Sequence, residues 1–86
     1  MNIESPEEFS PALLRLIDRW CDQRRLPALA RLLPGYVGFN GLSDGWEGLR
    51  AGLTSARALG AETIGDADWA VLGDLIRATE AALGER

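Results

Sequence analysis

The sequence predicts a small all-α protein, an antiparallel bundle of three longer helices and one short helix. Apolar residues recur at helical spacing in separate stretches, no stretch alternates as a β-strand does, and only a few residues connect one helical stretch to the next. The chain has 86 residues, of which 47% are apolar, so it is expected to form one domain, residues 1–86, and not to be disordered.

The first long helix is expected at about residues 11–24, after a separate short turn at 6–9. Pro11 marks its start, because the residue before a proline resists helical geometry. Its apolar face consists of Leu13, Leu16, Ile17, Trp20 and Cys21, with Leu14 at the edge. Cys21 is therefore expected to be buried and unreactive. Arg24 falls in the last turn, where a cation can bond the terminal carbonyls.

A second, short helix is expected at about 27–33, ended by Pro34 and Gly35. Residues 34–43 include three glycines and an asparagine and predict an ordered loop that extends to Ser43. This loop holds Tyr36 and Phe39. Aromatic loop residues are favoured anchors at interfaces, although both rings could instead close over one end of the bundle.

The third helix is expected at about 44–59 and is interpreted as the central one. Asp44 and Glu47 have the spacing of a capping box, and Trp46 opens an apolar stripe. Gly60 is placed as the C-terminal stop. A neighbouring row holds only small residues: Gly48, Gly52 and Ala56. Glycine in a helix costs about 1 kcal/mol relative to alanine, so these glycines predict that another backbone packs very close.

The fourth helix is expected at about 66–83, with apolar residues over nearly half of its surface. One flank consists of Trp69, Leu72, Ile76, Thr79 and Leu83, and the adjacent flank of Val71, Leu75, Ala78 and Ala82. A stripe this wide indicates either contact with two helices at once or a partly exposed dimer interface.

The charge of the chain is unevenly distributed. The net charge is −4, and every basic residue is an arginine. Residues 1–43 balance five acids with five arginines, whereas residues 61–85 carry six acids against Arg77 alone. The C-terminal third is therefore expected to form an acidic surface that repels phosphate backbones and attracts a basic partner.

The residue types present exclude most catalytic chemistry. Histidine is absent, which removes histidine-based acid–base catalysis, the usual nucleophilic triads and the Glu-x-x-His motif of di-iron bundles. The spacing of Gly41, Gly45 and Gly48 superficially resembles a phosphate loop but lacks a preceding strand and a lysine. A DNA-binding helix-turn-helix would need a basic recognition helix, and neither the third nor the fourth helix is basic. We therefore expect no enzyme activity, no cofactor or metal and no nucleic-acid binding.

Two further features concern location. No apolar run approaches the length of about 18 residues that a membrane span needs. The segment after Met1 is acidic, without the basic and then apolar pattern of a secretion signal. A cytoplasmic protein without membrane contact is the expectation, and its activity is expected to be binding to another protein.

Three segments carry a resemblance to a known family: Trp20-Cys21-Asp22-x-Arg24-Arg25, Leu32-Leu33-Pro34-Gly35-Tyr36, and Leu42-Ser43-Asp44-Gly45-Trp46 followed by Leu49, Leu53 and Arg57. Over roughly residues 13–83 the chain resembles small helical immunity proteins of bacterial polymorphic toxin systems, of the contact-dependent growth inhibition or Rhs type. The resemblance implies a cytoplasmic protein that binds a cognate toxin domain and covers its active site. Many such toxins are nucleases with basic clefts, which an acidic partner suits.

The residues expected to contact the toxin are acids of the fourth helix, with the loop aromatics and one further acid near the rim: Asp66, Asp74, Glu80, Tyr36, Phe39 and Asp44. Charge reversal at Asp74 and Glu80 should then slow association and weaken its salt dependence. On this reading the free protein is a monomer. The alternative is a non-catalytic structural or adaptor module that homodimerises through the wide apolar stripe of the fourth helix.

Overall fold

The computed structural model describes residues 6–39 and 43–84, except the side chains of residues 6–8, 10, 43 and 44. Within these ranges the chain forms five helices and no strand. They are α1 (Pro6–Asp22), α2 (Leu26–Val37), α3 (Ser43–Arg57), α4 (Ala61–Ile64) and α5 (Asp66–Gly84). The predicted all-α fold is confirmed, with a second helix longer than expected and a one-turn helix, α4, that the sequence did not predict.

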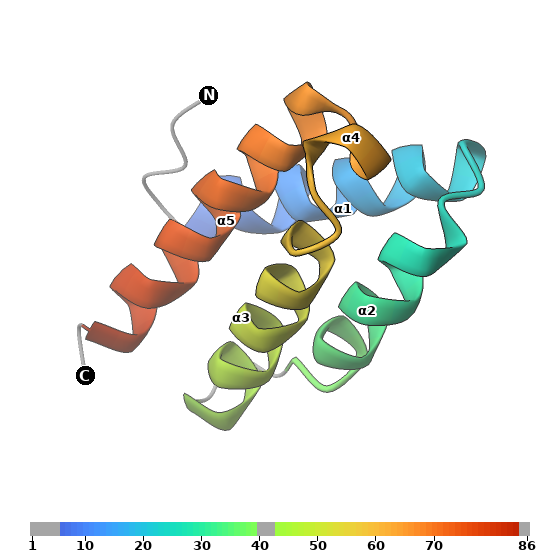
Figure 1. Ribbon diagram of the computed structural model, residues 1–86. Coiled ribbons are helices and arrows are strands. Elements are labelled where there is room, and N and C mark those ends of the chain that lie inside the picture. Colours follow the sequence, from blue (N-terminus) through green and yellow to red (C-terminus); the bar gives the residue numbers. More distant parts are fainter. Residues whose placement is uncertain (1–5, 40–42, 85–86) are drawn as a thin grey trace.

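Helix α3 occupies the centre of the molecule. It lies between α2 and α5 and runs antiparallel to both, while α1 crosses behind them (Figure 1). The core consists of the facing sides of these helices: Phe9, Ala12, Leu13, Leu16, Ile17, Trp20, Ala28, Leu29, Leu32, Trp46, Leu49, Leu53, Ala56, Ile64, Leu72 and Leu75. The prediction that the helix opened by Trp46 is the central one is therefore confirmed.

Helix α1 is continuous across Pro11, so the predicted division into a turn at 6–9 and a helix from 11 is wrong. A proline this near the start of a helix removes only one intrahelical hydrogen bond. In addition, Phe9 is buried, and its ring lies 5.2 Å from that of Trp46, centroid to centroid. This contact with α3 holds the first turn of α1 in line with the rest of the helix.

The C-terminus of α1 also differs from the prediction. The helix ends at Asp22, and Arg24 lies beyond it in the left-handed conformation, with φ of 54°. The backbone N–H of Arg25 donates to the carbonyl of Trp20, and that of Arg24 to the carbonyl of Cys21. These two bonds form a Schellman motif, so Arg24 caps the helix through its backbone conformation.

Helix α2 continues through Pro34 and Gly35, where the sequence predicted its end, and Tyr36 is a helical residue. The reason is a close approach to α3. A Cβ at Gly35 would lie 2.4 Å from the carbonyl oxygen of Gly48, and a Cβ at Gly52 would lie 3.1 Å from that of Leu32. The backbone contact that the small residues of α3 predicted is therefore present, and α2 must stay helical to make it.

Two glycines with positive φ connect α3 to α5. Helix α3 ends at Arg57, before the predicted end at 59. Gly60, with φ of 90°, directly precedes α4, and Gly65, with φ of 94°, follows it. Between them the short α4 buries Ile64 in the core. Helix α5 then follows the predicted range closely and packs against α1, α3 and α4.

Candidate functional site

The acidic residues predicted to bind a partner lie on α5 and differ in their surroundings. Asp66, in the first turn, and Glu80, near the end, are exposed to solvent. Asp74 is half-buried and forms an ion pair with Arg77. Glu62, on α4, is a further exposed carboxylate at this end of the chain. These four residues, Glu62, Asp66, Asp74 and Glu80, are called the α4–α5 acidic surface below.

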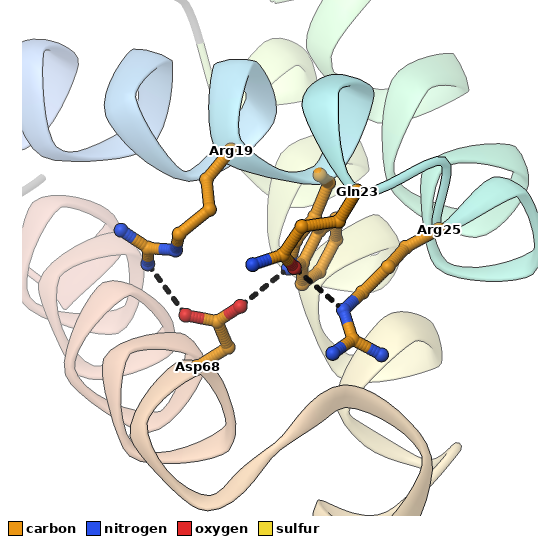
Figure 2. A network of polar contacts seen from close by, with 5 residues as sticks. Arg19, Gln23, Arg25 and Asp68 are labelled. Atoms are coloured by element: carbon orange, nitrogen blue, oxygen red, sulfur yellow. Dashed lines mark hydrogen bonds and ion pairs between the residues drawn. The ribbon is translucent and has the colours of Figure 1, made fainter.

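Asp68 is one of the six acids of residues 61–85 that were expected to form an acidic surface, and the structure corrects that expectation. Its carboxylate is buried between α5 and α1 (Figure 2), where Oδ1 accepts a hydrogen bond from Arg19 Nη2 at 2.5 Å and Oδ2 accepts one from Trp20 Nε1 at 2.8 Å. The carboxylate thus accepts one hydrogen bond from an indole in the core and one from a guanidinium at the edge of the core. A charged group can be buried when it is paired and hydrogen-bonded in this way. Asp68 therefore has a structural role.

The same view contains a second polar contact next to Asp68. Arg25 Nε donates to Gln23 Oε1 at 2.8 Å (Figure 2), and Arg25 Nη1 donates to the carbonyl of Thr63 at 2.6 Å. The first bond lies within the turn after α1, and the second connects this turn to α4. Arg25 is therefore engaged within the molecule.

Tyr36 and Phe39 lie together on the other side of α3. Both are half-buried and packed against the core, and the Phe39 ring meets that of Trp46 edge-on, with centroids 4.8 Å apart. They line a groove of about 360 Å³ whose walls are apolar except for the tyrosine: Leu13, Leu14, Tyr36, Val37 and Phe39. The observed packing agrees with the alternative in which both rings close over one end of the bundle.

The structure does not bring the six predicted contact residues together. Asp66, Asp74 and Glu80 lie on α5, whereas Tyr36 and Phe39 lie at the end of α2, and α3 separates the two helices (Figure 1). Asp44 begins the first turn of α3, and its side chain lies outside the described residues. The predicted capping box with Glu47 is therefore not tested.

Glu80 also lines a shallow depression of about 520 Å³ between α3 and α5. The residues around it are Arg50, Ala51, Thr54, Ser55, Ile76 and Glu80. Arg50 places a positive charge on the α3 side of the depression, opposite to the charge of Glu80 on α5. Arg50 therefore offsets part of the negative charge that Glu80 contributes on this side of α5.

The apolar stripe of α5 is used almost entirely inside the molecule. Leu72, Leu75 and Thr79 are buried, and the remaining members except one are partly buried against the core. The exception is Trp69, of which 37% is exposed. The width of the stripe therefore reflects contact with several helices at once, the first of the two readings that the sequence left open.

Trp69 takes part in a contact that the sequence analysis missed. The guanidinium carbon of Arg57 lies 3.7 Å from the centroid of the Trp69 ring, and Arg57 Nε donates to the carbonyl of Trp69 at 3.2 Å. The two residues lie at the end of α3 and the start of α5. The sequence indicated this contact only through the residue types, since arginine and tryptophan commonly pair in this way.

Cys21 is exposed, and the prediction that it is buried is wrong. It lies in the last turn of α1, where Trp20 is buried against α5 while Cys21 lies on a side that faces solvent. Among the described residues, no three acidic or cysteine side chains lie close enough together to hold a metal ion. None of the described helices combines the length and hydropathy needed to cross a bilayer.

The fold and its surfaces define a small helical bundle with an acidic side on α4 and α5 and an apolar groove beside α1 and α2. The sequence matches no family model, and comparison with curated proteins and with solved structures found no similar protein.

Proposed function

We propose that this protein is an immunity protein, which binds a toxin domain and blocks it through the α4–α5 acidic surface. The observation that carries the proposal is the state of three carboxylates. Glu62, Asp66 and Glu80 are exposed, and no arginine among the described residues lies within ion-pair distance of them. Carboxylates without internal partners project a negative potential into solvent and attract a basic surface.

The partner is a toxin nuclease. A cleft that binds nucleic acid carries arginine and lysine side chains that contact phosphates, and carboxylates can occupy the same positions. The resemblance of the chain to immunity proteins supports this choice of partner. It also supports action in the cytoplasm, where a delivered toxin would meet its substrate.

The contact surface in this proposal contains α4 and α5 only. Tyr36 and Phe39 lie on the other side of α3, so a partner seated over α5 does not reach them without extending around the bundle. The free protein is a monomer in this proposal, because the apolar stripe of α5 contacts α1, α3 and α4. Light scattering at high micromolar concentration tests this point, and a dimer would favour the adaptor hypothesis instead.

The experiment uses the protein encoded by the reading frame adjacent to that of this chain, purified as a catalytically inactive variant. Association rates are measured by surface plasmon resonance at low and high salt, and protection is measured as growth of bacteria that express the active toxin. The test variant is Asp66→Arg with Glu80→Arg. The matched control is Asp18→Arg with Asp22→Arg, which changes the net charge equally at two exposed positions of α1.

Reversal on α5 is expected to slow association at least about tenfold at low salt and to weaken its salt dependence, because these charges steer the encounter. The control pair should change the rate by no more than about threefold, the part that net charge alone contributes. Equal rates for the two variants would place the contact elsewhere. If the unmodified chain neither binds nor protects, the immunity function itself is wrong.

A further inference from the structure

Trp69 differs from the two other tryptophans of the chain. Trp20 is completely buried and Trp46 nearly so, whereas 37% of Trp69 is exposed on α5. An indole left partly in water retains apolar area that binding to another surface can bury. Of the three tryptophans, Trp69 therefore retains the most area that a partner can bury.

The side chain of Trp69 is held in one arrangement by Arg57. The guanidinium lies against the ring at 3.7 Å, and its Nε–H donates to the backbone carbonyl of the same residue. Gly73, one turn further along α5, leaves the room that the guanidinium occupies, since a Cβ there would lie 2.8 Å from Arg57 Nη2. A side chain fixed in this way loses little conformational entropy on binding.

The surroundings of this pair are acidic. Asp66 precedes Trp69 by three residues, which places both on one side of α5, and it is exposed. Glu62 is exposed on α4, which packs against α5. The other two carboxylates in this part of α5 have partners within the molecule. Asp68 is bonded to Arg19 and Trp20, and Asp74 forms an ion pair with Arg77. A partner therefore meets the positive charge of Arg57 against the indole and the negative charges of Asp66 on α5 and Glu62 on α4.

We infer that the Arg57–Trp69 pair is the anchor by which the α4–α5 acidic surface binds its partner. The inference rests on the proposed function and adds to it the kind of surface that fits. That surface offers an apolar slot for the edge of the indole, flanked by lysine or arginine side chains that face Asp66 and Glu62. Tryptophan and arginine are the residue types that most often carry binding free energy, and charges at the rim mainly set the association rate.

A second exposed apolar patch, on α1 and the end of α2, fits such a partner less well. Val37 is 79% exposed and Leu14 is 44% exposed beside the groove between α1 and the end of α2. None of the described residues that line this groove is charged. A basic surface gains no electrostatic attraction there, so the acidic side with Trp69 is the better match.

The test compares two truncations of exposed apolar side chains, Trp69→Ala and Val37→Ala. The probe is again the inactive product of the adjacent reading frame, and affinity is measured by isothermal titration calorimetry. Trp69→Ala is expected to weaken binding at least about 30-fold, the loss typical of an anchor residue. Val37→Ala should stay within about twofold, although its side chain is the more exposed.

A second variant, Gly73→Ala, tests the pair without touching the indole or the fold. Alanine in place of glycine favours a helix, so the melting temperature should stay the same or rise. The added Cβ displaces the guanidinium from its place beside Trp69, and we expect binding to weaken about three- to tenfold. This variant decides the question if Trp69→Ala fails to fold, as judged by circular dichroism.

The outcomes separate the two proposals. If the unmodified chain does not bind the probe, the proposed function is overturned and the anchor with it. If the chain binds and Trp69→Ala binds within about twofold, the anchor is overturned while the proposed function stands. Binding by Gly73→Ala at the unmodified affinity would overturn the role assigned to Arg57.

Discussion

Trp20 and Asp68, 48 residues apart in the sequence, meet in the core, where the indole Nε1–H donates to the Asp68 carboxylate at 2.8 Å. Arg19, the neighbour of Trp20, bonds the other oxygen of the same carboxylate. Two consecutive residues of α1 thus converge on one side chain of α5. This contact sets how α5 sits against α1, and thereby which face of α5 is turned to solvent.

Replacing the buried carboxylate should be costly. Asp68→Ala leaves the Trp20 N–H without its acceptor, and we expect a loss of about 2–3 kcal/mol in the free energy of unfolding. Asp68→Asn keeps an acceptor oxygen and should lose less. Urea denaturation monitored by circular dichroism measures both. As a control, Asp18→Ala removes an exposed carboxylate from α1 and should change stability by no more than about 0.5 kcal/mol. Equal midpoints for Asp68→Ala and Asp18→Ala would show that the contact contributes nothing.

The crossing of α2 over α3 predicts opposite effects for neighbouring glycines. Gly35→Ala places a methyl group 2.4 Å from the Gly48 carbonyl oxygen, and the two helices must separate, so we expect a loss of about 2–3 kcal/mol. Gly38→Ala meets the nearest atom at 3.6 Å, an ordinary contact, and should be close to neutral. Gly48→Ala points into open space on α3 and should stabilise the protein by up to about 1 kcal/mol.

Thermal melts of the three glycine variants provide the measurement. The expected order of melting temperatures is Gly48→Ala highest, Gly38→Ala near the unmodified protein and Gly35→Ala lowest. A stable Gly35→Ala protein would mean that the helices do not cross as closely as described here.

Trp46 joins three helical segments through its ring. It is buried and contacts Phe9 of α1 and Phe39 after α2. Trp46→Ala is expected to cost about 3–5 kcal/mol, the usual range for a buried aromatic side chain, which is enough to unfold much of a domain this small. Chemical denaturation measures the loss, with Trp69→Ala as the comparison at a partly exposed tryptophan. A melting temperature lowered by only one or two degrees would contradict the central place of Trp46.

The exposure of Cys21 has a direct chemical consequence. Its thiol should react with a disulfide reagent such as dithionitrobenzoate in the folded protein, to one equivalent, without added denaturant. Cys21→Ser should leave the free energy of unfolding unchanged within about 0.5 kcal/mol. A thiol that reacts only after unfolding would show that this turn of α1 is covered in solution.

The interiors of α1, α3 and α5 followed from the sequence. The apolar spacing around Leu16, Leu53 and Leu72 identified the helices and most of the core, because a helix with 3.6 residues per turn must bury the residues that recur at that period. Gly60 was placed correctly in the connection after α3, where its lack of a side chain permits the positive φ, but the helix itself ends earlier, at Arg57. These are local properties, and they are readable without knowledge of the neighbours.

The prolines were where local reasoning failed. Pro11 and Pro34 were read as helix boundaries, and both lie inside helices. A proline costs a helix one hydrogen bond and a steric clash, which is decisive in an isolated peptide. Here the burial of Phe9 and the contact of Gly35 with α3 outweigh that cost. Both contacts come from residues distant in sequence.

The candidate site was likewise predicted only in part from the sequence. Composition alone predicted that the C-terminal third is acidic, and the charge pattern excluded nucleic acid as the expected partner. Which carboxylates face solvent was decided by the tertiary structure, since Asp68 differs from Asp66 only in the face of α5 on which it lies. The pairing of Arg57 with Trp69 required the ends of two helices to meet. The residue types and their spacing are properties of the sequence, and they determine the helices and the total charge. The exposure and the partners of a side chain depend on how the helices pack, which no single segment determines.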